Sequence, residues 1–270
     1  MKNLFLGDIM GKAGRRALHD FLPKLLEDLS PDIVIANGEN AAHGNGITKK
    51  FCEEFYALGI HCITTGNHVW DQREVIKYIE KDERLLRPIN FPQGTVGQGI
   101  WESELEDGRK IAVINIMGRL FMEPLDDPFA VIERALEGKV LGNNYDAIFI
   151  DFHGEATSEK MAFAQYLDGR VSAVVGTHTH IPTADSQIFP EGTAFQADAG
   201  MCGDYDSVIG VKKHTSINRF TKKMPGEKME PAEGQGTLCG VFVVTDDQTG
   251  KAIRIDPVRL GARLSQTQPV

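Results

Sequence analysis

Short apolar runs alternate with helical patterns in the first half of the chain. The runs at residues 3–6, 32–36 and 61–65 are each followed by apolar residues at helical spacing. Strands that alternate with helices are typical of a largely parallel sheet. Pro23 lies inside the first helical pattern and is expected to kink or split it, because proline removes a backbone donor. Thr48 is expected to cap the second helix.

The second half of the chain has a different pattern. Proline and glycine between residues 87 and 99 predict loops, and the short runs after them predict a mixed or antiparallel extension. Further strands are predicted at residues 100–101, 111–116, 147–150 and 171–175, with helices at 129–141 and 158–167. Shorter strands in the tail, at 186–189, 193–197, 240–245 and 252–256, suggest a second sheet. We predict an α/β fold in which two mixed β-sheets pack as a sandwich with flanking helices, forming a single domain over residues 1–270.

Composition excludes several classes of protein. The chain has 29 Lys and Arg against 38 Asp and Glu, a net charge of −9, so a broad basic surface for nucleic acid is not expected. No apolar stretch approaches the roughly 18 residues that a membrane-spanning helix needs. The four cysteines form no C-x-x-C pair and no signal peptide precedes the first strand, so we expect a cytoplasmic protein with buried, unreactive thiols.

Polar side chains follow the predicted strands at the points where the strands end. In open α/β sheets, ligands bind outside the carboxyl ends of the strands. The residues there are Asp8, Glu39, Asn40, Asn67, His68, His153, His178 and His180. Carboxylate and amide oxygens together with imidazoles suit a pair of divalent metal ions, and a glutamate can bridge two ions.

Each of these residues also has an ordinary structural interpretation. Asp8 could cap a helix, Glu39 and Asn40 could be loop residues, and Asn67 is a common turn residue. The pair His178 and His180 is harder to explain in this way, because side chains two apart on a strand point to the same side. If every ordinary interpretation were correct, five strand ends would each carry a residue type that binds metal ions, by coincidence.

The order of these motifs resembles the calcineurin-like metallophosphoesterase superfamily. The motifs are Gly7-Asp8, Gly38-Glu39-Asn40, Gly66-Asn67-His68, the lone His153 and Gly176-Thr177-His178-Thr179-His180. Residues 38–44, 66–71 and 152–160 further resemble the YmdB-type branch, a group of bacterial phosphodiesterases. The resemblance covers nearly the whole chain and implies a four-layer αββα fold.

The resemblance also implies a ligand set and two departures from the superfamily. One metal would be held by Asp8, Glu39, Asn40 and His180, and the other by Glu39, Asn67, His153 and His178. Met10 stands where most members have a histidine ligand, and Glu39 replaces a bridging aspartate, so Asn40 is expected to take part of the missing role. Val69 replaces a frequent acidic residue, which leaves Asp71 as a candidate to orient His68. Iron is the expected metal, with manganese as the first alternative and zinc or nickel less favoured.

The expected chemistry is metal-assisted hydrolysis of a phosphodiester. Two cations about 3.5–4 Å apart would clamp the phosphate and activate a bridging hydroxide. His68 would protonate the leaving alkoxide, a role that suits imidazole because it titrates near neutral pH. The family implies a small phosphodiester, above all a 2′,3′- or 3′,5′-cyclic nucleotide. A phosphomonoesterase or phosphoprotein phosphatase with the same centre and a regulatory nucleotide-binding protein are the alternatives. The pattern at residues 200–210 predicts either a loop at the rim of the substrate site or a plain surface turn. The oligomeric state, including a homo-oligomer, is left open.

Overall fold

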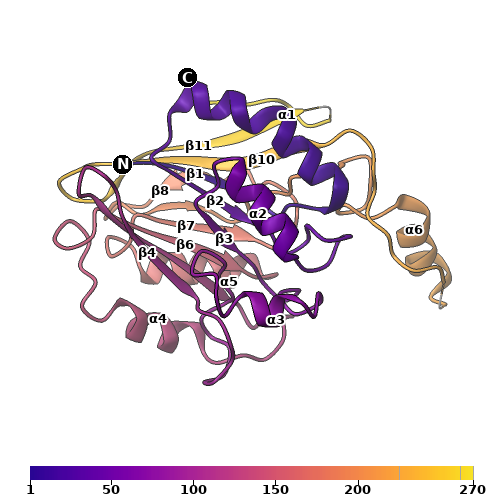
Figure 1. Ribbon diagram of the computed structural model, residues 1–270, viewed down its shortest axis with the longest axis horizontal. Helices are drawn as coiled ribbons and strands as arrows, with labels where there is room; N and C mark the ends of the chain where they lie inside the picture. The colour runs from indigo at the N-terminus through magenta and orange to yellow at the C-terminus, as the bar shows by residue number, and fades with distance from the viewer. Residues whose placement is uncertain (225, 262, 270) are drawn as a thin grey trace.

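Two mixed β-sheets pack face to face in this computed structural model, which describes residues 1–224, 226–261 and 263–269 (Figure 1). The first sheet has the order β11-β10-β1-β2-β3. Its strands are β1 (Lys2–Leu6), β2 (Ile33–Asn37), β3 (Cys62–Thr64), β10 (Thr237–Thr245) and β11 (Ala252–Gly261). Strands β1, β2 and β3 are parallel, whereas β10 pairs antiparallel with both β1 and β11.

The second sheet has the order β4-β5-β6-β7-β9-β8. Its strands are β4 (Ile100–Glu104), β5 (Lys110–Met117), β6 (Ala147–His153), β7 (Ala173–Thr177), β8 (Gln187–Ile188) and β9 (Ala194–Gln196). The four central strands run parallel, and the two edge strands β4 and β8 pair antiparallel with their neighbours. The helices are α1 (Gly11–Leu29), α2 (Lys49–Ala57), α3 (Val75–Tyr78), α4 (Pro128–Leu136), α5 (Thr157–Tyr166) and α6 (Lys213–Lys222).

Three apolar clusters separate the four layers of the fold. The inner cluster lies between the sheets, where the rings of Phe5 and Phe149 stack with centroids 5.4 Å apart. A second cluster packs α1 and α2 on the first sheet, and a third packs α4 and α5 on the second sheet. This arrangement confirms the predicted sandwich with flanking helices. Within the described ranges, no helix is both long and apolar enough to cross a membrane.

The structure corrects the predicted grouping of the tail strands. They do not form a sheet of their own, because β10 and β11 extend the first sheet while β8 and β9 extend the second. Pro23 does not split α1, since it lies on the exposed side of an uninterrupted helix. Thr48 caps α2 as predicted, accepting a hydrogen bond from the Phe51 amide. Helix α6 is not predicted by the sequence pattern.

The parallel strands bring their carboxyl ends to one edge of the sandwich. A buried carboxylate holds the two sheets together there, because Asp151 on β6 accepts hydrogen bonds from Thr64 on β3 and Asn37 on β2. The loops that follow β1, β2, β3, β6 and β7 therefore meet above Asp151.

Candidate metal centre

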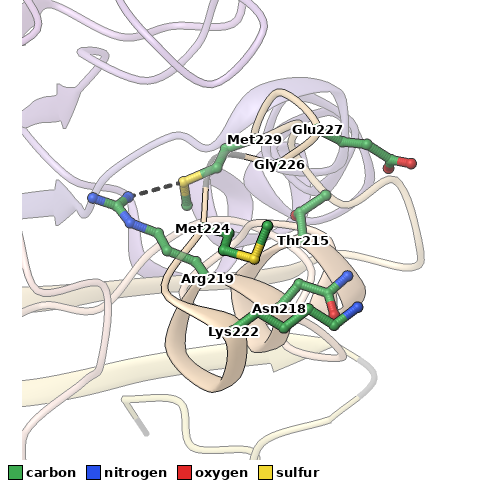
Figure 2. Close-up of a pocket in the computed structure, with 8 residues that line it drawn as sticks. All are labelled: Thr215, Asn218, Arg219, Lys222, Met224, Gly226, Glu227 and Met229. Carbon is green, nitrogen blue, oxygen red and sulfur yellow. Dashed lines mark hydrogen bonds between the residues drawn. The ribbon is translucent and has the colours of Figure 1, made fainter.

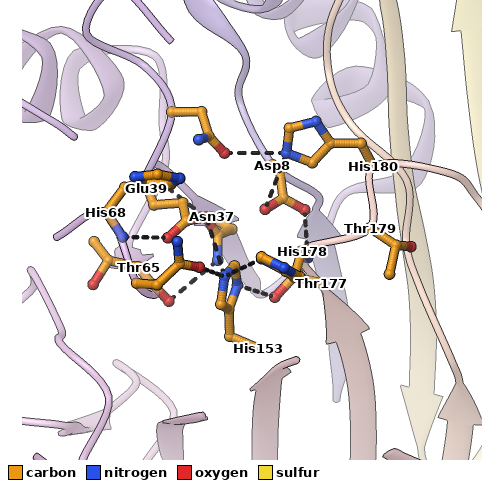
Figure 3. A network of polar contacts seen from close by, with 12 residues as sticks. Asp8, Asn37, Glu39, Thr65, His68, His153, Thr177, His178, Thr179 and His180 are labelled. Atoms are coloured by element: carbon orange, nitrogen blue, oxygen red, sulfur yellow. Dashed lines mark hydrogen bonds and ion pairs between the residues drawn. The ribbon is translucent and has the colours of Figure 1, made fainter. Parts of the chain in front are cut away.

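Glu39 lies at the middle of one group of predicted ligands (Figure 3). Its Oε1 atom is 3.1 Å from His153 Nε2, which also lies 3.0 Å from Asn67 Oδ1 and 3.1 Å from His178 Nδ1. The ligand atoms of Glu39, His153 and His178 all lie within 4.8 Å of one another. The four residues predicted for one metal are thus adjacent.

The remaining predicted ligands form a neighbouring group. His180 Nε2 is 3.2 Å from Asn40 Oδ1 and 3.9 Å from Asp8 Oδ1. The backbone amide of His178 donates to Asp8 Oδ2 at 3.2 Å, which joins the two groups. Asp8, Glu39, Asn40 and His180 are all buried. The structure therefore brings together all seven residues predicted as ligands; their role in metal binding stays a prediction.

Hydrogen bonds of the Nδ1 atoms of His153 and His180 determine which ring nitrogen faces the candidate metal centre. Thr177 donates its hydroxyl hydrogen to Asp151 Oδ1 at 2.7 Å, so its oxygen accepts from His153 Nδ1 at 2.9 Å. The Ile209 carbonyl can only accept, so His180 Nδ1 donates to it at 2.8 Å. Because Nδ1 donates in both rings, each ring directs Nε2 toward the centre, which is the arrangement that outer partners impose on metal-ligating histidines.

The electrostatics of the centre follow from burial and from these close contacts. Burial raises the pKa of Asp8 to about 6 despite the nearby histidines. Burial alone would raise the pKa of Glu39 and lower that of His153. The attraction between the two groups outweighs burial, so the pKa of Glu39 is lowered and the pKa of His153 is raised. Burial, reinforced by charged His153, lowers the pKa of His178 to about 3. In the absence of a metal ion, Glu39 and His153 therefore form a buried ion pair.

Three observations show that the site fits a cation. Within the described residues, the buried Asp8 Oδ1 has no hydrogen-bond partner. His153 Nε2 faces three polar atoms at 3.0–3.1 Å, which one N–H cannot serve equally. A side chain at Gly66 would enter this space, since its Cβ would lie 2.3 Å from His153 Nε2 and 2.5 Å from Glu39 Oε2.

His68 lies at the solvent side of the centre. Its backbone amide donates to Glu39 Oε2 at 3.1 Å, and its ring Nδ1 lies 2.8 Å from Asp71 Oδ2. About a third of its side chain is exposed, unlike the buried His153. The contact with Asp71, the candidate partner from the sequence, is present, and among the described residues Nε2 of His68 has no hydrogen-bond partner.

Several supporting residues were missed in the sequence. Asp151 could have been found, because it is a charged residue at an inward position of the apolar strand β6, two before His153. Glu155, which lies 3.3 Å from His178 Nε2, and Ile209, whose carbonyl orients His180, carry no such signal. Tyr205 in the predicted rim loop is structural, since its hydroxyl contacts the backbone of Met201 and His180.

A buried ion pair supports the loop that carries His178 and His180. Both histidines have positive φ, at 97° and 68°, a conformation that non-glycine residues adopt only when their surroundings enforce it. Lys160 Nζ donates to the Thr177 carbonyl at 2.8 Å and to Asp198 Oδ2 at 2.9 Å. Asp198 Oδ2 also accepts from the amide and hydroxyl of Thr179 at 3.0 and 2.7 Å. These contacts hold the loop on both sides of His178.

The Lys160→Met variant is expected to lower the free energy of unfolding by about 3–5 kcal/mol, because it leaves the Asp198 carboxylate buried without its partner. Urea denaturation of the metal-free protein measures the loss. The double variant with Asp198→Asn should lose less than the sum of the two single variants, since the residues are in direct contact. Additive losses would contradict the role given to this pair.

The fold and the convergence of these residues define a metallophosphoesterase-like α/β sandwich. A model of the family described as "YmdB-like protein" matches residues 4–258, and the chain belongs to this family.

Comparisons with individual proteins agree with this family. A Bacillus subtilis (strain 168) protein named 2′,3′-cyclic-nucleotide 2′-phosphodiesterase is 46% identical over 258 residues, covering 96% of both chains. A crystal structure of a Thermus thermophilus protein titled as hypothetical has a TM-score of 0.90 at 40% identity, covering 97% of this chain and 100% of that one. A Mycoplasma pneumoniae structure titled as a novel phosphatase has a TM-score of 0.90 at 35% identity, covering 97% and 93%. The chain is accordingly an enzyme of the phosphoester-hydrolase type.

Proposed function

We propose that this chain is a dimetal phosphodiesterase that hydrolyses small phosphodiesters, with cyclic nucleotides as the favoured substrates. The observation that carries the proposal is the convergence of imidazole nitrogens and side-chain oxygens in one buried space. His153 and His180 turn Nε2 toward carboxylate and amide oxygens, and within the described residues the buried Asp8 Oδ1 has no hydrogen-bond donor. Buried oxygens that face one another repel unless positive charge lies between them, and metal ions would supply it.

Two divalent metal ions fit the two groups of ligands, with Glu39 shared between them. When bound, such ions polarise a phosphoryl oxygen and lower the pKa of water, which supplies the nucleophile. We propose iron as the native metal and manganese as the first alternative, because mixed imidazole, amide and carboxylate ligands suit both. Thr177 and Ile209 hold the two rings so that Nε2 of each faces the proposed metal ions.

His68 is the proposed general acid. Its Nδ1 is directed to Asp71, so the opposite nitrogen is available to protonate the leaving alkoxide oxygen. Its backbone amide is fixed on Glu39, which places the ring beside the ligands without making it one of them. The exposed side of His68 leaves room for a substrate.

A small cyclic phosphodiester suits the charge of the chain and agrees with the name of the Bacillus subtilis relative. That relative is named for 2′,3′-cyclic nucleotides, so we propose this class ahead of 3′,5′-cyclic nucleotides. The net charge of −9 argues against a long nucleic acid as the natural substrate. We also propose a cytoplasmic location, which suits four cysteines that are all free and buried.

The test combines metal analysis with hydrolysis of matched substrates. We expect about two metal ions per chain after purification with Fe²⁺ or Mn²⁺, and cleavage of a 2′,3′-cyclic nucleotide and an aryl phosphodiester. A phosphomonoester of the same aryl group should be cleaved much more slowly. Preference for the monoester would favour the phosphatase alternative. Two metals without cleavage would favour a regulatory nucleotide-binding protein, and absence of metal would contradict the proposed centre.

A further inference from the structure

His178 differs from the other two imidazoles proposed as ligands in the nitrogen that it turns toward the centre. Its Nδ1 atom lies 3.1 Å from His153 Nε2, whereas His153 and His180 face the centre with Nε2 (Figure 3). The rings of His153 and His178 meet edge to face, with centroids 4.8 Å apart. His178 Nε2 is therefore directed away from His153, toward the outside of the centre.

Packing alone holds the ring of His178 less firmly than the other two rings. Its side chain is 22% exposed, compared with 0% for His153 and 9% for His180. The Nδ1 atoms of the other two rings are fixed by Thr177 and Ile209. A contact that fixes His178 from outside the centre has to act on its Nε2 atom.

Glu155 supplies a contact of this kind. Its Oε2 atom lies 3.3 Å from His178 Nε2, and its side chain is half-exposed at the solvent side of the ring. A carboxylate can only accept a hydrogen bond, so Nε2 is the nitrogen that carries hydrogen in this contact. In a neutral ring the lone pair then lies on Nδ1, which faces the centre. A charged acceptor also makes the opposite ring nitrogen more basic, as carboxylates do for metal-ligating histidines.

The backbone beside Glu155 is tied to the loop that carries His178. Glu155 lies in the short connection between β6 and α5, which begins at Thr157. The Gly154 amide donates to the Thr177 carbonyl at 3.4 Å. Because Thr177 directly precedes His178, this bond joins the two segments that bring the carboxylate and the imidazole together.

We propose that Glu155 is a positioning residue, which holds Nδ1 of His178 toward the metal ion proposed for that ligand. This inference rests on the proposed dimetal centre. Glu155 is not proposed as a ligand itself. Among the described residues, the ligand atoms that all lie within 4.8 Å of one another come from Glu39, His153 and His178 and do not include Glu155.

Calorimetric titration of the metal-free protein with Mn²⁺ tests the proposal. We expect the wild type to bind two ions. Glu155→Ala should weaken the affinity for one of them by about 10–100-fold, as for loss of a residue that orients a metal ligand. The affinity for the other ion should not change, because its proposed ligands include His180 and not His178. Glu155→Gln keeps an oxygen that accepts a hydrogen bond and should recover part of the loss.

Glu227→Ala is the matched control. Glu227 is also an exposed glutamate that faces a histidine, since its Oε2 atom lies 3.1 Å from His214 Nε2. It lines a hollow of about 420 Å³ beside α6, and the lining residues drawn in Figure 2 include none of the proposed ligands. Its substitution removes a carboxylate from a histidine outside the centre and should leave both Mn²⁺ affinities unchanged.

Nitrogen-15 NMR of the histidine rings in the metal-free protein gives a second readout. The hydrogen on Nε2 of His178 should be observed in the wild type, shift in Glu155→Gln and be lost by exchange with water in Glu155→Ala. The spectrum of His178→Gln assigns the signal. This readout follows the contact between Glu155 and His178 and requires no bound metal.

Several outcomes would overturn the positioning role. Two Mn²⁺ ions bound with wild-type affinities in Glu155→Ala would remove it while leaving the dimetal centre intact. Equal weakening of both ions would indicate a general effect of negative charge, and failure of one ion to bind at any concentration would make Glu155 a ligand. An Nε2 signal that is the same in Glu155→Ala would show that the contact does not form. A wild type that binds no Mn²⁺ would instead refute the dimetal centre itself, and the positioning role with it. Circular dichroism of each variant checks that the fold is retained.

Discussion

The Glu39→Gln variant is expected to lose bound metal and hydrolysis of phosphodiesters together. Glu39 lies beside His153 and His178, and it is the only carboxylate proposed to serve both ions, so the change removes the shared ligand. Loss of a residue that only hydrogen-bonds to a metal ligand typically weakens metal affinity about 10–100-fold. Loss of the shared ligand itself should weaken metal affinity by more than this. Elemental analysis and calorimetric titration with Mn²⁺ measure the metal, and an aryl phosphodiester measures turnover.

Glu159→Gln is the matched control for this variant. Glu159 is also a buried glutamate, but its carboxylate accepts hydrogen bonds from the backbone amides of Arg119 and Leu120 and faces no imidazole of the centre. Its substitution should leave the number of bound metal ions unchanged. A Glu39→Gln protein that retained two metals and full turnover would refute the assignment of Glu39 as the shared ligand.

The His68→Ala variant is expected to retain both metals and to lose turnover in a manner that depends on the leaving group. A general acid contributes on the order of 10²–10⁴ in rate when the leaving alkoxide needs a proton. The loss should therefore be large for a 2′,3′-cyclic nucleotide and small for an ester of an acidic phenol such as 4-nitrophenol. Steady-state kcat for both substrates, measured at equal metal content, gives the comparison.

His19→Ala is the control for His68→Ala, because His19 is also a partly exposed histidine paired with a carboxylate, Glu54, at 2.8 Å. It lies on α1 away from the centre and should leave both rates unchanged. Equal losses on the two substrates in His68→Ala would exclude protonation of the leaving group as the role of His68. Asp71→Asn should cause a smaller loss of the same kind, since Asp71 acts only through the ring it orients.

Local patterns in the sequence predicted most of the secondary structure. Strands β1, β2, β6 and β7 are continuous apolar runs, which is the pattern of strands buried on both faces. The grouping of the tail strands was wrong, because β10 pairs with β1 across more than 230 residues of sequence and β11 pairs with β10. Such pairing depends on which edge is open after the central strands have assembled, and no local pattern carries that information. Helix α6 was missed because it has no buried apolar face of its own.

The sequence by itself determined which residue types stand at the strand ends, and the order of those motifs was sufficient to indicate the family and the residues proposed as ligands. Only the tertiary structure decided how these residues are supported. Asp151 acts on His153 through Thr177, Ile209 orients His180, and Lys160 with Asp198 holds the loop between them. These partners come from distant parts of the chain and act through backbone atoms or buried side chains. Their roles follow from three-dimensional proximity, because a hydrogen bond requires about 3 Å between atoms whatever their separation in sequence.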